Sequence, residues 1–161
     1  MMTIHSALLL VSLMAHSREA TTQPKGDYST WPDGRAVVLR PPRSKEGLRF
    51  CSRTAPQNVS GVWEVAAEDV ASVDAALYGH IRDTGLNKRL TLPVSKYQRQ
   101  FLGFLRGTGR FIYINAFPAR FRSAVANSSR EMPRICDGGT INWGIEYDLT
   151  KRVFLGFAPN F

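Results

Sequence analysis

The sequence predicts an α+β fold in which one main helix packs on an antiparallel sheet built from two hairpins and short strands. One segment carries apolar residues at helical spacing. Two later pairs of segments are rich in aromatic and β-branched residues, and each pair is separated by turn-forming residues. A helix that precedes two hairpins favours separate helical and sheet layers around one core.

The main helix is predicted over residues 67–84. Its apolar residues recur at spacings of three and four, and therefore share one face. They are Val70, Val73, Leu77 and Ile81. Acidic side chains in the first turn suit the helix dipole, and Gly85 is well placed to end the helix. We expect Asp74, His80 and Asp83 to lie off the apolar face, in contact with solvent.

The first hairpin is predicted to join residues 98–106 to residues 110–117 through the turn Gly107-Thr108-Gly109. The aromatic and β-branched composition of both segments supports this assignment. Short strands are expected to complete the sheet. They are residues 48–51, 62–65 and 133–137, whereas residues 36–39 look like a short extended piece within the N-terminal tail or linker.

The second hairpin is predicted to join residues 141–147 to residues 153–158. In the intervening turn, the side chains of Asp148 and Thr150 are suited to bond local backbone amides. Strand alternation places one set of apolar side chains on the face toward the helix. This set is Trp143, Ile145, Tyr147, Leu155 and Phe157. A helix laid across such a sheet is the layout of cystatin-like or PepSY-like domains, a likeness that carries no function.

The first residues of the chain are typical of a secretory signal peptide. Residues 7–15 form an uncharged apolar run that is too short to span a membrane, and cleavage is expected after Ser17. A buried N-terminal helix is the alternative. We therefore expect a signal peptide at residues 1–17, a Pro-, Gly- and charge-rich tail or linker at 18–47, and a single domain at 48–161. The expected location is secreted or periplasmic, with no transmembrane segment after signal removal.

The two cysteines, Cys51 and Cys136, are expected to form a disulfide in an oxidising compartment. Closing a loop of that length would stabilise the fold by about 4 to 5 kcal/mol in the chain-entropy model. Two separate buried thiols are the alternative. We expect no metal or cofactor, because after signal removal His80 is the single histidine left to join these cysteines as a ligand.

The formal net charge of +8, carried mostly by arginine, favours an anionic partner such as an envelope component or an acidic protein. Arginine bias of a GC-rich genome is the alternative. Arg106 and Arg110 flank the first hairpin turn, and we expect Arg120 and Arg122 to join them in an anion-binding patch. Nucleic acid is not expected, because Thr108 stands where the RNA-binding sheet motif needs an aromatic residue.

Motifs for catalysis are mostly absent from the sequence. Asp137 and Glu146 lie near aromatic residues, and two carboxylates are what glycan hydrolysis requires. The structural alternative is an aspartate that caps a turn and a glutamate on the solvent face, since Glu146 alternates with the apolar Ile145 and Tyr147. A Ser-His-Asp set would have to recruit His80 from the helix.

Five stretches carry a family resemblance. They are Cys51, GVWEV at 61–65, YQRQFLGFLRG at 97–107, RFIYINAFP at 110–118 and CDGGTINWGIEYD at 136–148. With them the chain resembles an uncharacterised family of short secreted or periplasmic bacterial proteins. The resemblance covers residues 48–161. It implies an envelope or extracellular setting and a disulfide between Cys51 and Cys136, and it implies no activity.

Three classes of function remain open from the sequence. The first is a non-catalytic binding or inhibitory module of the cell envelope, which a compact basic scaffold with aromatic surface would suit. The second is a structural protein associated with polyanions. The third is a small hydrolase that uses Glu146 or Asp137.

Overall fold

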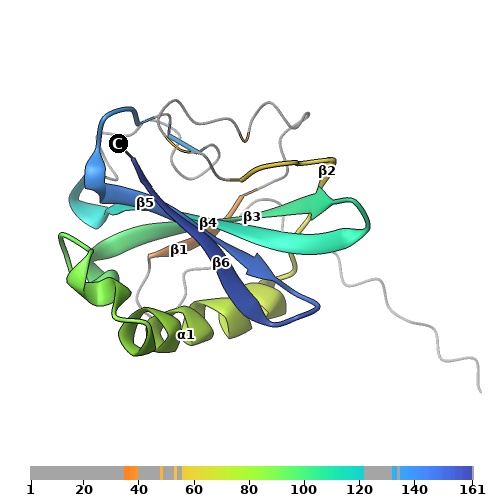
Figure 1. Cartoon of the computed structure of the whole chain (residues 1–161), viewed down its shortest axis with the longest axis horizontal. Coiled ribbons are helices and arrows are strands. Elements are labelled where there is room, and N and C mark those ends of the chain that lie inside the picture. Colours follow the sequence, from red (N-terminus) through yellow and green to blue (C-terminus); the bar gives the residue numbers. More distant parts are fainter. Residues whose placement is uncertain are drawn as a thin grey trace, which may run out of the picture.

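The computed structural model describes residues 35–39, 48, 53, 56–121, 132–133 and 135–160. In these residues one α-helix lies against one face of a six-stranded, mostly antiparallel sheet, so the predicted α+β class is confirmed (Figure 1). The helix is α1 (Ala67–Asp83), and the strands are β1 (Ala36–Val38), β2 (Gly61–Trp63), β3 (Tyr97–Arg106), β4 (Gly109–Pro118), β5 (Gly139–Asp148) and β6 (Val153–Asn160). Short 3-10 turns are η2 (Leu86–Lys88), η3 (Val94–Lys96) and η4 (Ala119–Phe121).

The sheet has the strand order β1-β3-β4-β5-β6, and β2 also pairs with β3. β1 runs parallel to the first half of β3, while β2 runs antiparallel to its second half. The sheet thus includes residues before position 48, where the domain was expected to begin. Residues 36–39 were expected to be a short extended piece of the tail, and the structure places Ala36–Val38 in the sheet as β1, beside β3. The described part of residues 133–137 forms no strand, so that expectation was wrong.

Helix α1 agrees with its predicted bounds and apolar face. Val70 and Leu77 are fully buried, and Gly85 ends the helix with a left-handed φ of 71°. The apolar face packs on the sheet side that carries Trp143 and Ile145, which confirms the predicted contact between the two layers. None of the helices in the described ranges is sufficiently long and apolar to cross a membrane.

The first hairpin has the predicted strands and a shorter turn than expected. Arg106 pairs with Gly109, which leaves Gly107 and Thr108 as a two-residue turn. Gly107 has a φ of 59°, a conformation that tight hairpin turns require and glycine adopts without strain.

The second hairpin differs from prediction along β6. Leu155 was expected to face the helix, but it pairs with Glu146 and is 39% exposed on the opposite side of the sheet. A bulge inserts one extra residue in this strand, and Gly156 there has a φ of 60°. The bulge shifts the alternation, so that Phe154 and Phe157 are the β6 side chains that pack with the helix-side core.

The sheet face opposite α1 has a second core cluster. Its buried members are Val37, Leu39, Leu48, Leu102, Phe104, Phe111, Tyr113 and Ala158. Val59, Val62 and Met132 pack against this cluster from segments outside the long hairpins. Both faces of the sheet are therefore covered, and polar residues that alternate with the helix-side core can be buried as well.

Candidate functional site

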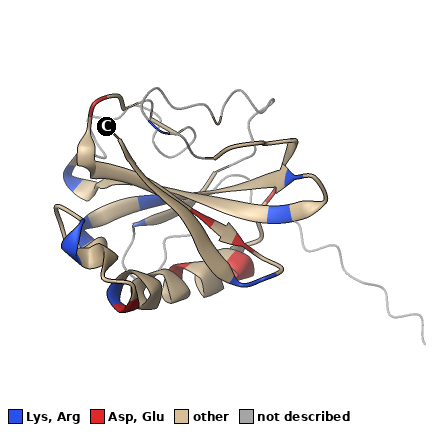
Figure 2. Ribbon diagram, in the orientation of Figure 1, with Lys and Arg blue, Asp and Glu red and all other residues tan. Residues whose placement is uncertain are grey.

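The turns of the two hairpins meet at one end of the sheet. The backbone N–H of Leu149, in the β5–β6 turn, donates to the carbonyl oxygen of Arg110 at 3.2 Å. This end carries three exposed cationic residues, Arg110, Lys151 and Arg152, and we name them the basic end. Figure 2 shows Lys and Arg in blue at the ends of both hairpins. Arg152 has a φ of 57°, which the turn imposes on a residue with a side chain.

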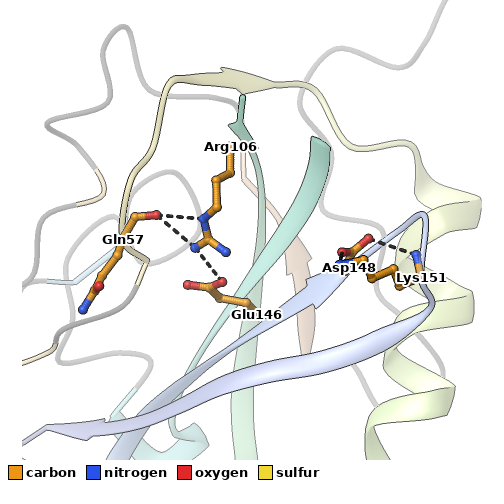
Figure 3. Close-up of polar contacts among 5 residues, drawn as sticks. All are labelled: Gln57, Arg106, Glu146, Asp148 and Lys151. Atoms are coloured by element: carbon orange, nitrogen blue, oxygen red, sulfur yellow. Dashed lines mark hydrogen bonds and ion pairs between the residues drawn. The ribbon is translucent and has the colours of Figure 1, made fainter. Parts of the chain in front are cut away.

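Arg106 lies beside the basic end but is engaged in contacts within the protein. Its Nη2 donates to Glu146 Oε2 at 2.8 Å and to the carbonyl oxygen of Gln57 at 2.9 Å (Figure 3). Its guanidinium also lies over the rings of Phe104 and Phe111, with 4.8 Å to the Phe111 centroid. Arg106 therefore links the end of β3 to Glu146 of β5 and to the backbone at Gln57.

Glu146 does not lie on a solvent face, as the alternation of its strand had suggested. Its side chain is 5% exposed and its partner is Arg106. The prediction was wrong because the sheet is covered on both sides, so a polar residue opposite the helix is buried too. A carboxylate in such a place requires a cation or amides to offset its lost hydration.

Asp148 organises the β5–β6 turn. Its Oδ1 accepts hydrogen bonds from the backbone amides of Thr150 at 2.9 Å and Lys151 at 3.0 Å, as predicted for this turn. Lys151 Nζ lies 3.9 Å from Asp148 Oδ2, but the lysine side chain is 74% exposed. The ammonium group is thus held loosely and remains open to other anions.

Arg110 is held differently, by an aromatic platform. Its guanidinium lies over the Trp63 ring at 3.9 Å. The Trp63 indole N–H donates to the carbonyl oxygens of Phe104 and Phe111 at 3.1 Å each, which fixes the ring on the sheet. Gly103 beneath it leaves room for the indole, since a Cβ there would clash with Trp63. Arg110 is consequently oriented by a rigid surface while its residue stays exposed.

The remaining residues of the predicted patch are not brought together with this end. Arg120 follows β4, and a strand of ten residues places it roughly 30 Å from Arg110. Its guanidinium lies over Phe121 at 4.9 Å. Arg122 lies outside the described residues. The structure thus separates Arg106 and Arg110 from Arg120 along the length of β4.

Arg99, a cationic residue on the first strand of the first hairpin, is fully buried. Its Nε donates to Asp74 Oδ1 at 2.6 Å and its Nη2 donates to Asp74 Oδ2 at 3.0 Å. Asp74 was expected in solvent, yet its side chain is 13% exposed. The bidentate pair joins α1 to β3, and neither residue is available to a ligand.

A buried polar network crosses the second face of the sheet. The sequence pattern did not lead us to predict these contacts. Arg53 Nη1 donates to Tyr113 Oη at 2.9 Å and to Asn115 Oδ1 at 2.7 Å, and its Nε donates to Asn160 Oδ1. Burial raises the pKa of Tyr113. Asn115 in turn donates to Gln100 Oε1 at 2.6 Å. The available signal was polar residues alternating with aromatic ones inside β3 and β4.

The residues weighed for catalysis do not form a site among the described side chains. Asp137 is exposed, with a φ of 59°, and lies before the start of β5, whereas Glu146 lies near the other end of that strand. His80 stacks on Phe154 with 4.7 Å between ring centroids, and burial lowers its pKa. The part of the chain that is described holds no group of three His, Cys, Asp or Glu side chains able to bind a metal.

Comparison with protein-family models, curated proteins and solved structures found no match. The resemblance to short secreted bacterial proteins therefore stays a prediction, as does the cystatin-like or PepSY-like layout.

Proposed function

We propose that this chain is an exported, non-catalytic binding module that holds an anionic macromolecule of the cell envelope at its basic end. The observation that carries the proposal is the exposure of Arg110, Lys151 and Arg152 on two hairpin ends that a backbone hydrogen bond ties together. The Arg110 guanidinium is already oriented on the Trp63 ring, so it loses little conformational freedom when an anion binds. The formal net charge of +8 adds long-range attraction to such a partner.

The carboxylates near this end favour binding over hydrolysis. Glu146 is paired with Arg106, and Asp148 accepts two turn amides. Glycoside hydrolysis needs two carboxyl groups that face one bond, one of them able to donate a proton. Carboxylates committed to cations and amides are poor candidates for these roles. Asp137 lies before the start of β5 and Glu146 near its end, so a hydrolase using Glu146 or Asp137 has less support.

The disulfide between Cys51 and Cys136 is part of the proposal. Asn160 accepts from Arg53, and its Nδ2 donates to the carbonyl oxygen of Ile135 at 2.6 Å. Positions 53 and 135 thus share one partner, and each is within two residues of a cysteine. Mass spectrometry of unreduced, alkylated protein from the secreted or periplasmic fraction should find no alkylated cysteine. Recovery of both cysteines alkylated would argue against the pairing and the oxidising location.

Retention on heparin resin tests the binding proposal with two variants of equal charge. The first carries Arg110→Gln and Lys151→Gln at the basic end, and the second carries Lys96→Gln and Arg120→Gln at the other end of β3 and β4. The basic-end variant should elute at clearly lower salt than the control. Exposed charges are screened within about 8 Å at 0.15 M salt, so elution reports local clustering of charge. Equal elution of the two variants would contradict a site at the basic end. Retention would then be explained by the net positive charge of the whole protein.

A further inference from the structure

Strand β6 forms an edge of the described sheet. Among the described strands it pairs with β5 alone, and its outer side carries no partner strand (Figure 1). Natural proteins protect such edges with charged side chains, prolines and bulges. Pro159 and the bulge at Gly156 protect the second half of β6. Residues 153–155 precede these features, and none of residues 153–156 is charged.

This first half of β6 also exposes apolar side chains at alternate positions. Val153 is 41% exposed and Leu155 is 39% exposed, whereas Phe154 between them packs into the helix-side core. The two side chains lie on the same face, next to Asp148 and Glu146 of β5. A further strand laid along β6 would cover both with cross-strand neighbours, the contacts that stabilise sheets.

The charge around this edge favours an acidic occupant. The two carboxylates that neighbour Val153 and Leu155 are both engaged, Glu146 by Arg106 and Asp148 by turn amides and Lys151 (Figure 3). Arg152, directly before β6, is exposed and contributes a positive charge at the start of the edge.

We propose that β6 accepts an extended acidic segment of a partner protein as an added strand. The inference rests on the proposed function and assigns its anionic partner to the class of acidic polypeptides. The segment's backbone pairs with residues 153–156, its apolar side chains cover Val153 and Leu155, and its carboxylates meet the basic end. Main-chain hydrogen bonds supply affinity in this mode of recognition, and alternate side chains supply specificity.

The experiment uses an acetylated, amidated peptide of alternating Asp and Val, and a twin with N-methyl groups on every second backbone amide. In the free, isotope-labelled protein, the outward amides of residues 153–156 should exchange rapidly with solvent. Addition of the unmodified peptide should shift their NMR signals and slow their exchange. The twin should bind about ten-fold more weakly, because it cannot donate the main-chain hydrogen bonds.

A second set of variants separates edge pairing from charge attraction. Val153→Ser with Leu155→Ser should weaken peptide binding several-fold and leave heparin retention unchanged, since both residues are uncharged and exposed. The matched control is Tyr78→Ser, an exposed apolar residue on α1, which should change neither.

Three results would overturn the inference. Outward amides of residues 153–156 that are already protected in the free protein would mean that the chain itself or a second copy covers the edge. Equal binding of the two peptides would assign the attraction to charge alone. Peptide-induced shifts confined to other strands would place the segment elsewhere. Retention on heparin that depends on the basic end would still support the proposed function in each of these cases.

Discussion

Replacing Gly144 with alanine should destabilise the fold strongly, because this glycine lies beneath the buried polar network. A Cβ built at Gly144 would be 2.9 Å from Arg53 Nη1 and 2.5 Å from Tyr113 Cζ, and closer still to the Tyr113 hydroxyl. Side chains cannot occupy positions so close, and Tyr113 is fully buried, so its ring has little freedom to withdraw.

Two costs determine the expected magnitude. Overpacking of a dense core costs about 1 to 3 kcal/mol. Displacement of Tyr113 also breaks its hydrogen bond with the Arg53 guanidinium, and a bond to a charged group contributes about 1.5 to 3 kcal/mol. Together they predict a loss of about 2.5 to 6 kcal/mol, a large share of the about 5 to 15 kcal/mol by which a domain is stable.

Urea unfolding followed by tryptophan fluorescence measures this loss. The matched control is Gly79→Ala, because a Cβ at this helical glycine has no atom within 4 Å. The free energy of unfolding of the Gly79→Ala control should rise by about 0.5 to 1 kcal/mol, because alanine has a higher helix propensity than glycine. Gly144→Ala should cost less when combined with Tyr113→Phe, which removes the nearest atom. A loss below about 0.5 kcal/mol for Gly144→Ala alone would refute the packing of Tyr113 over this strand.

Three further predictions concern the helix. Leu77→Ala should lower the free energy of unfolding by about 2 to 5 kcal/mol in a urea titration, as buried leucine truncations do, and no loss would place this face in solvent. Asp74→Ala should cost about 3 to 5 kcal/mol because it removes the carboxylate that offsets the charge of the buried Arg99, while the exposed Asp83→Ala should change stability little; equal effects would disprove the buried pair. Burial lowers the pKa of His80, so the unfolded state binds a proton more readily, and unfolding free energy should fall as pH drops below about 6.5. His80→Phe should flatten this dependence between pH 8 and pH 5, and an unchanged slope would exclude His80 as its source.

The helix and the first hairpin were predictable because their signals are local. Four apolar residues at helical spacing and a glycine stop define α1 whatever the rest of the chain does. Likewise, Gly107 marks the turn between β3 and β4, since the turn needs a left-handed residue at that position.

The second strand of the second hairpin could be recognised, but its alternation could not. A bulge at Gly156 changes which residues face the helix, and a single glycine in a strand pattern does not reveal whether a bulge is present. Leu155 was therefore assigned to the wrong face. β1 is a similar case. Its parallel pairing with β3 is a long-range contact, and the pattern of three residues does not predict such a pairing.

The predicted anion-binding patch placed Arg120 beside Arg110, and the length of β4 separates them. Arg110 and Arg120 are close in sequence, but an extended chain of ten residues separates them by roughly 30 Å. The hairpin instead places Arg110 beside the β5–β6 turn, about forty residues further along the chain. Lys151 and Arg152, which were read as turn residues alone, are thus its true neighbours at the basic end.

The errors on Asp74 and Glu146 share one cause, which also bears on function. Each residue was expected in solvent because it lies off the apolar pattern of its helix or strand, whereas both faces of the sheet are covered and bury charges that have partners. The Asp74–Arg99 and Glu146–Arg106 pairs are internally neutral, so removing them from the surface leaves the net charge of the exposed residues unchanged. The positive charge is then carried by fewer side chains, and those at the hairpin ends hold a larger part of the field that an acidic partner meets.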